Sequence, residues 1–122
     1  MELKFRALLV DTVCMQERRN EVRMLCADMV EVCWNEGGRR KTATVLLEDI
    51  SPSGACLQME APLPLGTPIR WQSSKQQFTG SVRYCVFREI GYFVGVEFEP
   101  DSQWSKKTYR PQHLLDLRRL LG

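Results

Sequence analysis

The middle of the chain alternates apolar and polar positions with a period of two residues. Val30, Val32 and Trp34 fall on one face of the first such stretch, and Glu31 falls on the other. A period of two is typical of strands that bury one face. The alternating stretches are residues 26–34, 41–48, 55–60, 69–72, 80–87 and 92–99. They predict a mainly β fold, a six-stranded antiparallel barrel or sandwich.

Turn-forming residues separate these stretches. The clearest are the glycine-, proline- and serine-rich segments 35–38, 61–68 and 73–77. Such clusters punctuate strands because glycine and proline favour turn conformations. Within the stretch 80–87, strict alternation predicts that Val82, Tyr84 and Val86 share one face.

The two ends of the chain differ from the middle. Near the C-terminus, Leu114, Leu117 and Leu121 recur at helical spacing after Pro111, which predicts a short amphipathic helix. Near the N-terminus, apolar residues recur every fourth position, so residues 2–14 are expected to form a helix or an extra strand. We therefore expect one domain with four parts: an N-terminal element (1–17), an arginine-rich loop (18–23), the barrel (24–99) and a C-terminal helical segment (100–122).

Composition narrows the function. A chain of 122 residues with 43% hydrophobic content can bury one modest core. Its formal charge of +2 is too small to favour binding of a nucleic acid polymer. The 5 cysteines form no CxxC pair, which indicates reduced residues of a cytoplasmic protein. No segment approaches the roughly 20 apolar residues of a membrane span.

Catalytic and metal-binding patterns are weak. The single histidine, His113, lies in the leucine-rich terminal segment, so it has no evident nucleophile partner. The glycines before Arg39 and Arg40 lack the order of a phosphate-binding loop. We therefore expect neither an enzyme nor a protein with a metal or cofactor.

Two other clusters carry more information. The first is the stretch 16–24, which contains Arg18, Arg19 and Arg23 and few apolar residues, so core packing does not require it. The alternative is a solvated basic linker. The second cluster is Asp49–Gly54, where serine, proline and glycine suit a tight turn by themselves.

Taken together, the clusters are complementary to a compact dianion that carries guanine bases. Guanidinium groups bind phosphate or the O6/N7 edge of guanine in bidentate fashion and stack on bases. A carboxylate such as that of Asp49 can accept from guanine N1 and N2, and the hydroxyl of Ser51 can bind base or phosphate. Gly54 lets the backbone approach a ligand closely.

With these residues in view, the sequence resembles the PilZ domains, bacterial receptors for cyclic di-GMP. The segment Arg19–Arg23 matches the RxxxR motif of that family, and Asp49–Gly54 matches its DxSxxG motif. The stretch Gly91–Glu99 is similar to the family's VGVxF strand. The order and spacing of the two motifs make the resemblance fairly specific.

The resemblance implies a six-stranded PilZ-type barrel whose arginine loop folds over a ligand on the outer surface. Arg19 and Arg23 would bind guanine edges and phosphates, with Arg18 as an additional contact. Asp49, Ser51 and Gly54 would line the opposite side of the ligand.

The chain also departs from the family pattern near these residues. It has Ser53-Gly54 where many members have two glycines, and Pro52 stiffens the turn. Glu21 adds a negative charge inside the arginine motif, which would weaken binding of a dianion if it points inward.

The expected function is a cytoplasmic receptor that binds cyclic di-GMP and passes the signal to an unidentified protein partner. The main alternative is a ligand-independent PilZ-type adaptor in pilus or motility machinery. A third hypothesis is a small barrel that binds single-stranded nucleic acid, for which Arg83, Phe87 and Arg88 are candidates.

Overall fold

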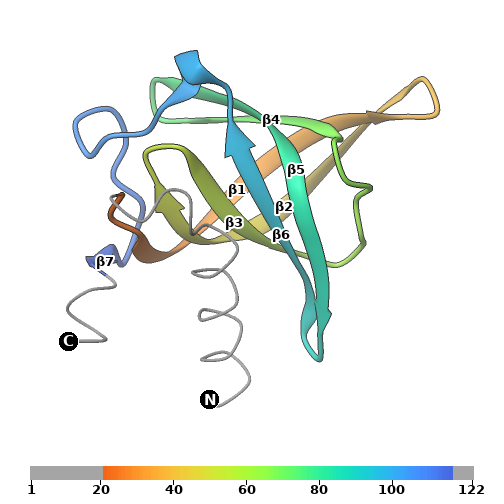
Figure 1. Cartoon of the computed structure of the whole chain (residues 1–122), viewed down its shortest axis with the longest axis horizontal. Helices are drawn as coiled ribbons and strands as arrows, with labels where there is room; N and C mark the ends of the chain where they lie inside the picture. Colours follow the sequence, from red (N-terminus) through yellow and green to blue (C-terminus); the bar gives the residue numbers. More distant parts are fainter. Residues whose placement is uncertain (1–20, 117–122) are drawn as a thin grey trace.

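A computed structural model describes residues 21–116 and shows a mainly β architecture, as predicted (Figure 1). The six predicted strands are all present, and several are longer than the alternation indicated. The strands are β1 (Met24–Glu36), β2 (Arg39–Ser51), β3 (Gly54–Met59), β4 (Pro68–Ser73), β5 (Gln76–Arg88) and β6 (Gly91–Phe98). A 3-10 helix, η2 (Pro100–Ser102), and a two-residue strand, β7 (Leu115–Asp116), follow.

The strands form a closed antiparallel barrel. They hydrogen-bond in the order β2-β3-β6-β5-β4-β1-β7, and an additional β1–β2 pairing closes the ring. The β1–β2 hairpin turns at Gly37 and Gly38, whose φ angles of 58° and 79° favour glycine. Strand β4 meets β1 through only two pairs of residues, Val32 with Trp71 and Cys33 with Arg70.

The barrel interior is filled by the residues that the alternation predicts. Val32, Leu57 and Val94 are completely buried. One end of the core is aromatic, with ring centroids 5.1–5.8 Å apart. That group consists of Trp71, Phe78, Phe98 and Tyr109.

Three register shifts interrupt the alternation, one each in β1, β2 and β5. In β5 the register shifts between Val82 and Tyr84. Val82 belongs to the core, and Cys85 packs against the same core. The prediction that Val82, Tyr84 and Val86 share one face is therefore wrong, because the bulge reverses the facing of the residues that follow it.

The predicted helix beginning at Pro111 is absent from the part of it that the structure describes. His113 has a φ of 57°, which ends any right-handed helical turn there. The chain then pairs Leu115 with Leu25, and the carbonyl of Gln112 accepts a 3.0 Å hydrogen bond from the N–H of Ala27. The backbone of β1 thus forms hydrogen bonds with this segment, and these replace the hydrogen bonds of a helix. The rest of this helix, and the predicted N-terminal element, lie outside the described residues.

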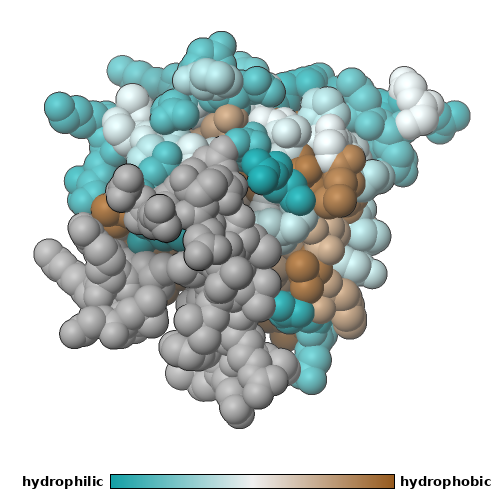
Figure 2. Space-filling view, in the orientation of Figure 1, coloured by the Kyte–Doolittle hydropathy of each residue, from teal (hydrophilic) through white to brown (hydrophobic). Residues whose placement is uncertain are grey.

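The surface is mostly polar on the face seen in Figure 2, with hydrophobic surface gathered along β5 and toward the β5–β6 hairpin. The hairpin extends beyond the barrel, which leaves Phe87 and Ile90 exposed by 61% and 64%. The ring of Phe87 packs against Tyr92 at 5.1 Å. Within residues 21–116, no helix has the length and apolar character needed to cross a membrane.

Candidate functional site

The Asp49–Gly54 segment forms the tight turn between β2 and β3. Ser51 and Gly54 pair across the hairpin, and Pro52 and Ser53 occupy its tip. The hydroxyl of Ser51 donates to the carbonyl of Gly54 at 3.3 Å. The predicted turn is therefore confirmed, and its ends are closed by both backbone pairing and a side-chain bond.

The tip of this turn is fastened to the rest of the barrel through its carbonyl groups. The N–H of Trp104 donates to the carbonyl of Pro52 at 2.9 Å, and the N–H of Phe98 donates to that of Ser53 at 2.8 Å. Both donors lie at the end of β6 or after it, so this part of the chain holds the tip of the turn in place. A backbone fixed in this way keeps its remaining donors in constant positions.

The bulge in β2 decides which way Asp49 points. The register shifts between Leu47 and Asp49, so Leu47 and Ile50 both face the core. Asp49 pairs instead with Cys56, which faces away from that core between Ala55 and Leu57. Strict alternation would have turned Asp49 inward. Bulges often re-aim a side chain in this manner beside functional sites.

A continuous row of residues crosses the outer face of four strands. Asp49 on β2 pairs with Cys56 on β3, Cys56 with Gly95 on β6, and Gly95 with Tyr84 on β5. A Cβ atom on Gly95 would lie 2.0 Å from the ring of Tyr84. The aromatic ring therefore packs against the glycine. The bulges in β2 and β5 place Asp49 and Tyr84 in the same row.

Arg23 joins the first motif to this row. Its Nη2 lies 2.5 Å from Oδ1 of Asp49, and the two side chains are 11% and 2% exposed. A charge-assisted contact of this length is strong, and Asp49 could not remain charged at such burial without partners. The ion pair holds the segment before β1 against the end of β2.

Glu21 makes a second link between the two motifs. Its Oε1 accepts hydrogen bonds from the hydroxyl of Ser53 at 2.6 Å and from the N–H of Ser53 at 3.2 Å. The carboxylate of Glu21, which lies inside the arginine motif, thus contacts Ser53 at the tip of the DxSxxG turn. Ser53 consequently uses both its donors on one carboxylate.

The pKa of Cys26 on β1 reflects the carboxylates near the ion pair. Its thiol donates to the carbonyl of Leu47 at 3.6 Å. Burial raises the pKa of Cys26 far above its ordinary value, and the carboxylates of Asp49, Asp28 and Glu48 raise it further. The thiol therefore stays protonated and uncharged beside these carboxylates.

The structure brings together four of the six predicted site residues. Arg23, Asp49, Ser51 and Gly54 meet where the start of β1 approaches the β2–β3 turn. Arg18 and Arg19 lie outside the described residues.

Sequence reasoning missed the bond of Glu21 to Ser53 and the position of Tyr84. One signal was available for the β2 bulge, because Leu47 and Ile50 are apolar with two acids between them, a spacing of three.

A hollow of about 350 Å³ adjoins Glu21. It is bordered by Glu21, Ser53, Glu97 and Glu99, with other residues of β5, β6 and η2. The carboxylates disfavour a phosphate deep in this hollow, although one of them, Glu97, is paired with Arg83. The donors of Ser53 lie at its border.

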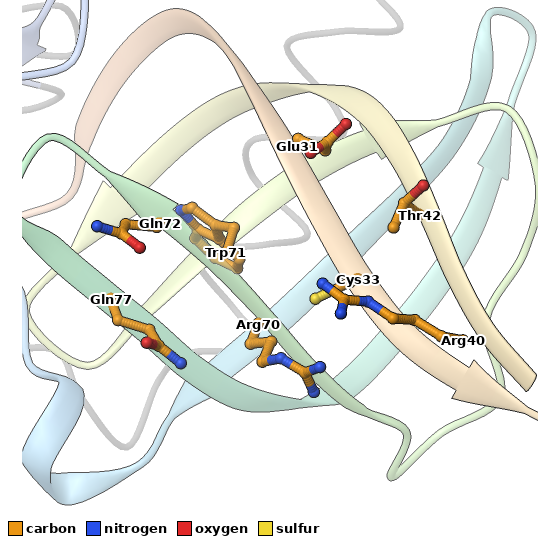
Figure 3. A pocket seen from close by; sticks show the side chains of 8 residues that line it. All are labelled: Glu31, Cys33, Arg40, Thr42, Arg70, Trp71, Gln72 and Gln77. Atoms are coloured by element: carbon orange, nitrogen blue, oxygen red, sulfur yellow. The ribbon is translucent and has the colours of Figure 1, made fainter.

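A second cavity of about 350 Å³ lies over the outer faces of β1, β2, β4 and β5 (Figure 3). Arg40 and Arg70 extend toward the same space near Cys33, whereas the carboxylate of Glu31 points away from them. The cavity is lined by Glu31, Cys33, Arg40, Thr42, Arg70, Trp71, Gln72 and Gln77. None of these residues belongs to the two motifs or to the row of Asp49.

Within residues 21–116, no group of three or more His, Cys, Asp or Glu side chains could hold a metal ion.

Comparison with known proteins gives one family. The family model described as PilZ domain matches residues 17–110. The match spans both motifs, all six barrel strands and the 3-10 helix. A search of curated proteins found no match.

Proposed function

The chain belongs to the PilZ domain family, and on that premise we propose that it is a receptor for cyclic di-GMP. Domains of this family are generally effectors that bind this second messenger, and they are typically binding or adaptor domains, not enzymes. The observation that carries the proposal is the contact between the motifs, Arg23 to Asp49 and Glu21 to Ser53.

The chemistry of the site suits a guanine nucleotide with two phosphates. The guanidinium of Arg23 can bind a phosphate or a guanine edge in bidentate fashion. The carboxylate of Asp49 can accept from the N1 and N2 donors of guanine, and the hydroxyl of Ser51 adds a further polar contact. Tyr84 provides an aromatic face in the same row, on which a base can stack.

Binding requires a rearrangement near Arg23. Asp49 is only 2% exposed, and its carboxylate is paired with the guanidinium of Arg23. A ligand that reaches Asp49 must therefore shift the segment 21–23 away from the turn. Such a shift changes the surface next to the turn, and a difference of this kind is what a protein partner can detect.

The proposal includes transmission of the signal to a protein partner. The Pro52 and Ser53 carbonyls connect the turn to Trp104 and Phe98, so a ligand on the turn adjoins the segment that follows β6. The competing function is a ligand-independent adaptor with the same barrel. It predicts a partner that binds equally well with and without nucleotide.

Calorimetric titration tests the proposal. Cyclic di-GMP is added to the whole chain, and GTP and cyclic di-AMP serve as controls for charge and base. We expect saturable binding of cyclic di-GMP alone, weakened at least tenfold by Asp49→Ala, since an unpaired guanine edge costs more than 1 kcal/mol. Absence of heat at near-millimolar cyclic di-GMP would favour the adaptor.

A further inference from the structure

Glu21 stands out because it presents a carboxylate to the donors of the turn. Its Oε1 accepts from both the N–H and the hydroxyl of Ser53, at 3.2 Å and 2.6 Å. Carboxylate and phosphate oxygens accept from the same kinds of donor, and backbone N–H groups at a turn are common anion contacts. The carboxylate of Glu21 thus occupies a position that suits an anionic oxygen.

The neighbouring groups identify which anion this position suits. Ser53 lies between Ser51 and Gly54, and Glu21 lies two residues before Arg23. The guanidinium of Arg23 is already directed at the same hairpin through Asp49. A phosphate that approaches Arg23 at this hairpin therefore comes close to both Glu21 and the donors of Ser53.

We propose that Glu21 is an affinity-determining residue that competes with a phosphate of the ligand for Ser53. The inference rests on the proposed function. When the ligand binds, its phosphate takes the donors of Ser53 and the carboxylate of Glu21 turns away. Glu21 thereby lowers the affinity for the dianion in two ways, because it occupies the donors and repels the ligand.

The surroundings of Glu21 strengthen its effect. Glu97 and Glu99 border the same hollow, and the guanidinium of Arg83 lies 2.5 Å from Oε1 of Glu97. Glu21 therefore borders a hollow that holds two further carboxylates, one of them paired with Arg83.

The test compares cyclic di-GMP binding to the unmodified chain and to Glu21→Gln by calorimetry. Glutamine keeps the size of the side chain and one oxygen acceptor, but it removes the charge. We expect the dissociation constant to fall by roughly three- to tenfold, as expected for the loss of one like charge from a partly solvated site. Glu21→Ala, which also removes the acceptor, is expected to tighten binding in the same direction.

Glu99→Gln is the matched control. It removes the same charge from the border of the same hollow, but the Glu99 side chain makes no hydrogen bond to the turn among the contacts of the described residues. We expect Glu99→Gln to change the dissociation constant by less than about twofold. An equal gain in both variants would overturn the inference, because general charge and not the Ser53 contact would then set the affinity.

The remaining outcomes separate this inference from the proposed function. If the unmodified chain binds cyclic di-GMP and Glu21→Gln binds it equally or more weakly, the inference is overturned and the proposed function stands. Binding by Glu21→Gln with none by the unmodified chain supports the inference and overturns the proposed function of the unmodified chain. If neither folded protein binds, both are overturned.

Discussion

Arg23 and Asp49, 26 residues apart in the sequence, are joined by an Nη2–Oδ1 contact of 2.5 Å. A second pair, Arg83 and Glu97, has the same 2.5 Å separation on the surface of the barrel. The first pair is 11% and 2% exposed, whereas the second is 45% and 30% exposed. The two pairs therefore differ mainly in burial.

The difference in burial predicts different contributions to stability. In a double-mutant cycle of alanine variants, Arg23 and Asp49 should couple by about 3 kcal/mol in the free energy of unfolding, because breaking a buried pair leaves an uncompensated charge. Arg83 and Glu97 should couple by less than about 1 kcal/mol. Urea unfolding of the single and double variants measures both values. Equal coupling in the two cycles would contradict the structural role of the Arg23–Asp49 pair.

Gly95 and Gly80 provide a second pair for comparison. A Cβ atom on Gly95 would meet the ring of Tyr84 at 2.0 Å, whereas one on Gly80 would meet the backbone oxygen of Glu97 at 2.3 Å. The ring of Tyr84 can be removed by mutation, whereas the backbone oxygen of Glu97 cannot. We therefore expect Gly95→Ala to cost about 2 kcal/mol of stability and Tyr84→Ala to relieve most of that cost.

Gly80→Ala should cost at least as much and should not be relieved by Tyr84→Ala. Thermal unfolding of the three single and two double variants gives the comparison. If Tyr84→Ala leaves the cost of Gly95→Ala unchanged, the ring does not lie against that glycine in solution.

Alkaline pH should destabilise the fold. Burial, followed by the hydrogen bond to Asp28, raises the pKa of Tyr109 far above its ordinary value, and burial does the same for Cys26. Both groups stay protonated in the folded chain while they ionise in the unfolded chain. Their contribution is therefore complete below about pH 9 and declines as the pH rises above it.

Each group steepens that decline by up to about 1.4 kcal/mol per pH unit. Tyr109→Phe keeps the ring and removes the hydroxyl, so it should flatten the dependence between about pH 10 and 11. Urea unfolding at a series of pH values tests this. If Tyr109→Phe and Cys26→Ala both lose stability with rising pH as steeply as the unmodified chain, other groups cause the decline.

The sequence predicted the barrel well because its strands bury one face. Val30, Val32 and Trp34 are all buried as the period required, and Glu31 between the first two is exposed. The hairpin turns were equally clear, since glycine and proline mark them directly. Local pattern and tertiary packing agree in these segments.

Prediction was weaker where the structure departs from regular alternation. The bulge before Tyr84 reverses its facing, and it depends on pairing with Gly95 on another strand. The C-terminal leucines have helical spacing, but β1 competes for the backbone near Leu115. Such outcomes depend on partners that are distant in sequence, so a local period cannot reveal them.

The site was predictable in its members but not in their contacts. The two motifs identified Arg23 and Asp49, and the structure pairs them directly. Glu21 was recognised as an unfavourable charge for a dianion, but its bond to Ser53 requires knowledge of where the turn lies. Side-chain direction in a segment without regular structure is not encoded in its spacing.

The most direct test of the central claim is a titration of the amide resonances of the whole chain with cyclic di-GMP by NMR. We expect the largest shifts at Arg23, Ser51, Ser53, Gly54 and Gly95, and none at Arg40 and Arg70 beside the other cavity. An unchanged spectrum at near-millimolar ligand, or shifts confined to Arg40 and Arg70, would contradict the claim that cyclic di-GMP binds where the two motifs meet.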